Sequence, residues 1–135
     1  MEYVRYIHRK HFDPHPSQNR FKSLAFRDTD GSGVSVVQCV CVDGSGRTVC
    51  AHAKHFYSPT ITDDPPVFWQ FDDAILPQGS VLEQKTSKSG DVCHHNIKNA
   101  KDKDLRQLFK NQDFRTFYIC EGDGTFRHLR REDLP

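Results

Sequence analysis

The chain has 135 residues, 36% of them hydrophobic and 27% charged, and its formal net charge is +1. This length and apolar content suit one folded domain over residues 1–135. No apolar run is long enough to span a bilayer, and the opening residues lack the pattern of a signal peptide. We therefore expect a cytoplasmic protein that makes no contact with a membrane.

The charge is spread unevenly along the chain. Residues 1–27 carry six Lys or Arg against two acidic residues, residues 28–83 carry two against eight, and residues 84–135 carry eleven against eight. If the two basic ends converge in space, they form a patch that suits an anionic partner. The alternative is that opposite charges pair across a solvated surface.

Two copies of the sequence Asp-Gly-Ser-Gly, at 30–33 and 43–46, dominate the first half of the chain after an opening strand at 3–7. They separate apolar segments at 22–28, 34–42 and 47–56, and turns of this composition join antiparallel strands. We predict a three-stranded meander from these segments. Its middle strand is apolar on both faces, which is typical of a central strand.

The second half predicts strands at 67–71, 81–86, 91–97, 114–120 and 125–129. One helix is predicted at about 100–111, with Asn99 as N-cap and a stripe formed by Leu105, Leu108 and Phe109. The expected fold class is α+β, a strand-rich single domain with a mainly antiparallel sheet built on the meander.

The five cysteines are an odd number without a dense framework, so we interpret them as reduced, buried thiols in a cytosol. The meander register would place four metal-binding residue types on one face: Cys39, Cys41, Cys50 and His52. Zinc accepts such ligands, but the same face carries Leu24, Phe26 and Val37, which indicates core. We favour structural cysteines and expect no metal or other cofactor, with a Cys39–Cys50 disulfide as a further alternative.

Adjacent histidines supply the clearest candidate for catalysis, at His94-His95-Asn96. In a strand, His94 and Asn96 point to one face and His95 to the other. A histidine titrates near neutral pH and serves as general acid or base, and two histidines can cleave a phosphodiester without metal. Candidate partners for the developing phosphate charge are Arg5, His8 and Arg115. The alternative is an ordinary pair of surface or core histidines.

The opening segment 3–12 interleaves aromatic and basic residues, a pattern that suits nucleic-acid binding. We favour a small binding module that recognises a protein or nucleic-acid partner through its basic N- and C-terminal segments. The alternative is a small, metal-independent nucleotide- or RNA-cleaving enzyme based on the histidines. The residues assigned to partner or phosphate binding are Arg5, Arg9, Lys10, Arg115, Arg127, Arg130 and Arg131.

Overall fold

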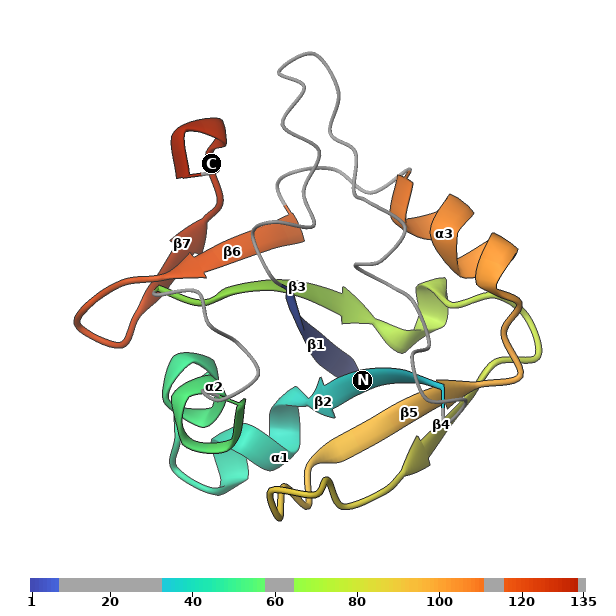
Figure 1. Cartoon of the computed structure of the whole chain (residues 1–135), viewed down its shortest axis with the longest axis horizontal. Coiled ribbons are helices and arrows are strands. Elements are labelled where there is room, and N and C mark those ends of the chain that lie inside the picture. Colours follow the sequence, from blue (N-terminus) through green and yellow to red (C-terminus); the bar gives the residue numbers. More distant parts are fainter. Residues whose placement is uncertain (8–32, 58–64, 111–115, 134–135) are drawn as a thin grey trace.

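The computed structural model describes residues 1–7, 33–57, 65–110 and 116–133 (Figure 1). Within these ranges seven strands form one antiparallel sheet in the order β4-β5-β2-β1-β3-β6-β7. The strands are β1 (Glu2–Ile7), β2 (Val34–Gln38), β3 (Val67–Asp72), β4 (Val81–Gln84), β5 (His94–Lys98), β6 (Phe117–Cys120) and β7 (Phe126–His128). The helices are α1 (Cys39–Gly44), α2 (Val49–Tyr57) and α3 (Asp102–Lys110), with short 3-10 helices η3 (Asp73–Ile75) and η5 (Arg131–Asp133). The predicted α+β class with a mainly antiparallel sheet is confirmed.

The first strand of the chain lies at the centre of the sheet because its side chains are apolar on both faces. Tyr3 and Ile7 belong to one apolar layer, whereas Val4 belongs to the other. Helix α3 packs on the first layer through Leu105, and α1 and α2 pack on the second, on the other side of the sheet. Figure 1 shows α1 and α2 together beside the end of β2, with α3 well apart from them.

The predicted meander is wrong from Cys39 onward: its second strand is confirmed only in its first half, and its third strand is a helix. The segment 34–42 is a strand only over Val34–Gln38, and the chain then forms α1 and, after a turn, α2 in place of the strand at 47–56. The buried residues of α2 recur with helical spacing, at Val49, Cys50, His52 and Ala53. A short apolar run fits both periods, so alternation alone does not separate a strand from a buried helix. The segment 22–28 lies outside the described residues.

The sequence at 43–46 therefore ends a helix instead of closing a hairpin. The backbone N–H of Ser45 donates to the carbonyl of Cys41, that of Gly46 donates to the carbonyl of Asp43, and Gly46 has a φ of 77°. A glycine with positive φ just after a helix is a common helix stop. Turn-forming residues predicted a break in the chain correctly but not the elements on either side of it.

The remaining predicted elements are close to those observed. The helix predicted at about 100–111 is α3, although it begins after Asn99, which has a φ of 60° and so turns the chain before the helix. The strand predicted at 91–97 is shorter, because residues 91–93 form a turn that precedes β5. None of the helices in the described ranges is long and apolar enough to cross a membrane.

Gly33 marks the point where the chain enters β2. Its φ is 103°, and a Cβ built on it would lie 2.4 Å from the carbonyl oxygen of Ile97 on β5. The neighbour is backbone and cannot rotate away, so only glycine allows β2 and β5 to approach at this point.

We predict that Gly33→Ala lowers the free energy of unfolding by about 2–5 kcal/mol, because the substitution adds a steric clash to an unfavourable φ. Gly46→Ala is the matched control, since φ is also positive there but the added Cβ would meet nothing within 4 Å. The control should lose about 1–2 kcal/mol. Urea denaturation measures both values, and equal losses would contradict the close approach of the two strands.

Candidate functional site

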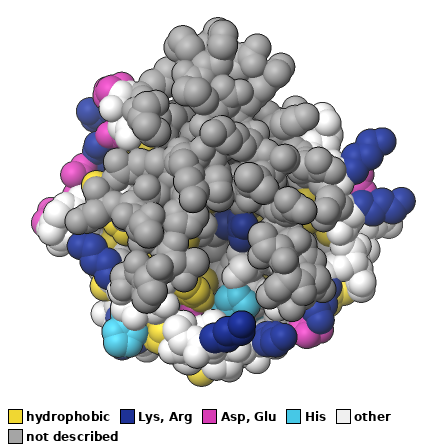
Figure 2. Space-filling model, in the orientation of Figure 1, with side chains coloured by type: hydrophobic (Ala, Val, Ile, Leu, Met, Phe, Trp, Pro, Cys, Tyr) yellow, Lys and Arg dark blue, Asp and Glu magenta, His cyan; other side chains and the backbone are white. Residues whose placement is uncertain are grey.

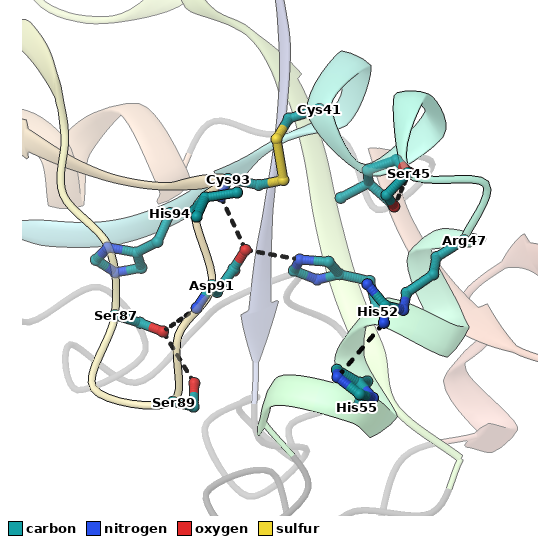
Figure 3. A network of polar contacts seen from close by, with 12 residues as sticks. Cys41, Ser45, Arg47, His52, His55, Ser87, Ser89, Asp91, Cys93 and His94 are labelled. Atoms are coloured by element: carbon teal, nitrogen blue, oxygen red, sulfur yellow. Dashed lines mark hydrogen bonds and ion pairs between the residues drawn. A yellow bond between two sulfur atoms is a disulfide. The ribbon is translucent and has the colours of Figure 1, made fainter.

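A buried carboxylate joins α2 to the turn that precedes β5 (Figure 3). The Oδ1 atom of Asp91 lies 3.0 Å from Nε2 of His52, and both side chains are about 1% exposed. The Tyr57 hydroxyl donates to Oδ2 at 2.6 Å, and the backbone N–H of Cys93 donates to Oδ1 at 2.9 Å. Both oxygens of the carboxylate therefore have donors, as a buried charge requires.

The other ring nitrogen of His52 faces Tyr6. The Tyr6 hydroxyl donates to the carbonyl of Val49 at 3.0 Å and lies 3.0 Å from Nδ1 of His52. A hydroxyl has one hydrogen, so it accepts the second contact from an Nδ1–H. Both ring nitrogens of His52 therefore have a hydrogen-bonding partner, which fixes the orientation of the ring.

Burial and hydrogen bonding shift the pKa of Asp91 in opposite directions. Burial alone would raise its pKa, but hydrogen bonds from His52, Tyr57 and the N–H of Cys93 outweigh it and lower the pKa below the usual range. The pKa of Tyr57 is raised, first by burial and then by the hydrogen bond that its hydroxyl donates to Asp91. Burial also raises the pKa of Tyr6, so both phenols stay protonated donors.

Two disulfide bonds attach the helices to the sheet. Cys41 of α1 is bonded to Cys93, with 5.5 Å between their Cα atoms, and Cys50 of α2 is bonded to Cys120 of β6, with 5.8 Å. They span 52 and 70 residues of sequence. In the loop-closure model each removes about 4 kcal/mol of unfolded-state entropy.

These bonds overturn the interpretation of the cysteines as reduced thiols for all but Cys39, which is free and buried. Burial raises the pKa of the Cys39 thiol to about 12. The zinc set of Cys39, Cys41, Cys50 and His52 is also wrong in this state, as is the Cys39–Cys50 disulfide, because Cys41 and Cys50 are bonded elsewhere. The predicted set depended on a hairpin that does not form.

A second polar group lies next to the first, where β2 pairs with β5. The carbonyl of Lys85 lies 2.7 Å from Nδ1 of His94, and the hydroxyl of Ser35 lies 2.5 Å from Nε2. A carbonyl only accepts, so Nδ1 carries a hydrogen and donates it to Lys85, and when the ring is neutral Nε2 accepts from the Ser35 hydroxyl. Ser35 is exposed to solvent, whereas His94 is buried. The hydroxyl of an exposed serine is thus hydrogen-bonded to an imidazole that a third group orients.

Asn96 lies on the same face as this pair. The register places it directly opposite Ser35, with His94 opposite Val37. Its side chain is only 3% exposed, and among the described residues no hydrogen bond joins its amide. A buried amide with unused donors is available to a group that enters beside Ser35.

The Arg5 side chain supports the backbone of Ser35. The β1–β2 ladder ends at the pair Val4–Val37, and Nη1 of Arg5 donates to the carbonyl of Ser35 at 2.6 Å. Burial lowers the pKa of Arg5 to about 10, a value at which the guanidinium is still charged at neutral pH. Arg5 therefore holds Ser35 from a neighbouring strand.

The other predicted site residues are dispersed. His95 lies on the opposite face from His94, with its ring edge-on to Tyr3 at 5.4 Å. Arg127 is paired with Glu121 and Asp133. Arg130 is exposed, and its backbone N–H donates to Asp133. Four predicted residues lie outside the described ranges, namely His8, Arg9, Lys10 and Arg115, and of Arg131 only the backbone in η5 is described.

The sequence suggested His94, Asn96 and Arg5 as site residues but not Ser35 or Asp91, which the structure brings into contact with His94 and His52. A serine within a strand and an aspartate within a turn are ordinary, so neither carries a local signal of chemistry. His52 stood out only as a metal ligand on a predicted strand. Comparison of the chain with protein-family models, curated proteins and solved structures finds no match.

We predict that Asp91→Asn lowers the free energy of unfolding at neutral pH by about 1–3 kcal/mol, because buried donors lose a charged acceptor. A carboxyl whose folded-state pKa is lowered stabilises the fold above its unfolded pKa of about 3.9, and this stabilisation is lost as the pH falls through the folded pKa. Denaturation at neutral pH and below pH about 4 should therefore show the difference from wild type shrinking on acidification.

Asp43→Asn is the matched control, because Asp43 is exposed on α1. It should change stability by less than about 0.5 kcal/mol at either pH. A difference between Asp91→Asn and wild type that does not depend on pH would contradict the assignment of an ionised Asp91.

Proposed function

We propose that the chain is a small, metal-independent hydrolase that cleaves esters with Ser35 as nucleophile and His94 as general base. One observation carries the proposal, the chain of hydrogen bonds from the Ser35 hydroxyl to His94 Nε2 and from His94 Nδ1 to the Lys85 carbonyl. A nucleophile in contact with a base, and a base oriented by a third group, is the shared arrangement of serine hydrolases on unrelated folds.

The first step follows from these contacts. The Ser35 oxygen attacks the carbonyl carbon or the phosphorus of the ester while its hydrogen passes to Nε2 of His94. The Lys85 carbonyl stabilises the positive charge that develops on the ring, because it accepts the Nδ1–H. The alkoxide leaving group departs with the hydrogen from Nε2, which leaves an ester on Ser35 and a neutral histidine.

Water completes the reaction by the same route. His94 takes a hydrogen from water, the hydroxide attacks the Ser35 ester, and the serine oxygen leaves and recovers the hydrogen. We assign to the Asn96 amide the donation of a hydrogen bond to the oxygen that becomes negative in both steps, and its position opposite Ser35 in the strand register supports this role. Arg5 is a positioning residue, since it acts through the Ser35 backbone.

The proposed substrates are esters. Among esters we propose the phosphodiester of a nucleotide or RNA, which is the substrate that the cluster of histidines in the sequence predicted. A carboxylic ester fits the same residues. We also propose that the protein is located in the cytoplasm. Disulfide bonds in that compartment are mostly catalytic or redox-sensing.

We predict that Ser35→Ala and His94→Gln each lower kcat/KM by about 10²–10⁴-fold, because each removes one member of the proton-transfer pair. The measurement uses p-nitrophenyl acetate and bis(p-nitrophenyl) phosphate, together with a fluorophosphonate that would add its mass to Ser35. His95→Gln is the matched control and should retain activity, because His95 lies on the opposite face. Turnover that survives Ser35→Ala, or a wild-type chain that cleaves neither ester, would overturn the proposal.

The favoured sequence interpretation, a binding module, is kept as a second candidate because of one feature at the sheet edge. Phe126 of β7 is 44% exposed and packs edge-on to Tyr118, on which His128 is stacked at 4.8 Å. An exposed aromatic ring suits the stacking of unpaired bases, and the exposed Arg130 follows two residues after β7. The partner in this case is a single-stranded nucleic acid.

The charge distribution supports this candidate less than the aromatic edge does. Arg127 is occupied by two carboxylates, and Arg5 by a backbone carbonyl. In the described part of the face in Figure 2, Lys and Arg side chains lie at several separate places, some with acidic side chains beside them. This arrangement favours the alternative in which opposite charges pair across the surface.

For this candidate we predict that Phe126→Ala weakens binding of a fluorescent single-stranded RNA by about 5–100-fold, because the exposed ring supplies one base-stacking contact. Fluorescence anisotropy at two salt concentrations measures the affinity. Val81→Ala is the control, since Val81 is similarly exposed but lies on the edge strand at the other end of the sheet. Equal affinities of the two variants would exclude the aromatic edge as a binding surface.

A further inference from the structure

Three buried ligand atoms of different chemistry meet beside the Cys41–Cys93 disulfide. Nε2 of His52, Oδ1 of Asp91 and Sγ of Cys93 all lie within 4.8 Å of one another, and all three residues are buried. Sγ of Cys41 is bonded to Sγ of Cys93 and so belongs to the same cluster. Figure 3 shows the disulfide next to the contact between His52 and Asp91.

The residue types match a structural zinc site. Zinc in closed protein sites is held by four ligands, drawn from cysteine sulfur, histidine nitrogen and carboxylate oxygen. The ligands here come from α1, α2 and the turn before β5, so a bound ion would join three separate segments. The set differs from the hairpin set expected from the sequence, because Asp91 and Cys93 take the places of Cys39 and Cys50.

The hydrogen bonds of His52 and Asp91 with two tyrosines leave one atom of each side chain, Nε2 and Oδ1, directed toward a candidate metal position. Nδ1 of His52 is directed at the Tyr6 hydroxyl, and Oδ2 of Asp91 accepts from the Tyr57 hydroxyl. Groups that form hydrogen bonds with the ligand atom facing away from a metal fix the orientation of the imidazole ring or carboxylate. Nε2 and Oδ1 then face each other, and an ion between them would replace the hydrogen that now joins them.

We propose that reduction of the Cys41–Cys93 disulfide creates a Zn²⁺ site formed by His52 Nε2, Asp91 Oδ1 and the two cysteine sulfurs. A dithiol reductant supplies two electrons and two hydrogens, so that the S–S bond breaks and the reductant leaves as its own disulfide. Zn²⁺ then binds the two thiolates, Oδ1 of Asp91 and Nε2 of His52, and it displaces to solvent the two thiol protons and the proton that joins Nε2 to Asp91. In the reverse direction a peroxide takes two electrons from the thiolates and two protons from solvent, and it is reduced to two waters or to a water and an alcohol. The S–S bond forms again, Zn²⁺ leaves, and Nε2 of His52 recovers a proton from solvent.

Both states attach α1 to the start of β5, the first by a disulfide and the second by a shared ion. The reduced chain therefore keeps α1 and α2 in place when zinc is present. The proposal is independent of the ester chemistry, because it uses neither Ser35 nor His94.

The experiment compares the oxidised chain with the chain reduced by a phosphine under nitrogen, both at full length. Elemental analysis after equilibration with Zn²⁺ should find one ion per reduced chain and none per oxidised chain. With Co²⁺ as probe, the reduced chain should show thiolate-to-cobalt charge-transfer absorption and the intense visible bands of a tetrahedral site. A reduced chain that binds no Zn²⁺ overturns the proposal.

Variants then locate the ion. His52→Gln and Asp91→Asn should each weaken Zn²⁺ binding by more than the about 10–100-fold that loss of an outer hydrogen-bond partner costs. His55→Gln is the matched control on the same helix, because His55 is exposed, and it should bind Zn²⁺ as wild type does. Cys39→Ser and the double variant Cys50→Ser/Cys120→Ser should also retain the ion. Loss of Zn²⁺ binding in either variant would mean that the ion binds at a different site.

Cys41→Ser covers the case in which a buried variant fails to fold. It removes one thiolate and leaves three ligands, so the charge-transfer absorption per bound Co²⁺ should fall to about half of the wild-type value because one of two Co–S bonds is lost. Circular dichroism reports the fold of each variant in the same samples. An unchanged cobalt spectrum in Cys41→Ser would overturn the assignment of Cys41 as a ligand.

Discussion

The buried carboxylate of Asp91 is the contact on which one whole side of the molecule depends. A charge in an apolar interior is tolerated only if its oxygens have donors, and here α2 supplies two of the three donors, through His52 and Tyr57. Helices of six and nine residues are not stable alone in water. The α1–α2 pair is therefore held by its packing on the sheet, by this carboxylate and by two disulfide bonds, rather than by its own propensity.

The contacts of Asp91 also help to position Ser35 and His94, the pair that we propose as catalytic. His94 follows Cys93 directly, so the bonds that fix Asp91 and Cys93 also fix the start of β5. The Lys85 carbonyl then orients the His94 ring, and Arg5 supports the Ser35 backbone where the β1–β2 ladder ends. Two kinds of chemistry thus lie near each other with different access to solvent: Ser35 is an exposed residue, whereas His52, Asp91 and Cys93 are buried. The first suits a substrate that enters and leaves, and the second suits an ion that is held.

Prediction from the sequence succeeded where a pattern had one physical meaning and failed where it had two. The stripe of Leu105, Leu108 and Phe109 fits only a helix, and α3 is found there. The run from Cys39 to Ala53 alternates well enough for strands, yet its buried residues also satisfy a helix, and burial against the sheet selected the helices. The same error affected the predicted site, because the zinc set and the facing of Cys39 with Cys50 depended on that one hairpin. The reduced thiols had a separate basis, the odd number of cysteines.

The sequence by itself determined the antiparallel α+β class, the strand at β5 and the fact that His94 and Asn96 share one face while His95 takes the other. These are local properties, set by side-chain alternation within a single element. Only the tertiary structure decided that Cys41 bonds to Cys93, that His52 pairs with Asp91 and that Ser35 contacts His94. Their partners are 52, 39 and 59 residues apart in sequence. No local pattern encodes such pairs, because each partner looks ordinary in its own segment and acquires its role only when the sheet order brings the segments together.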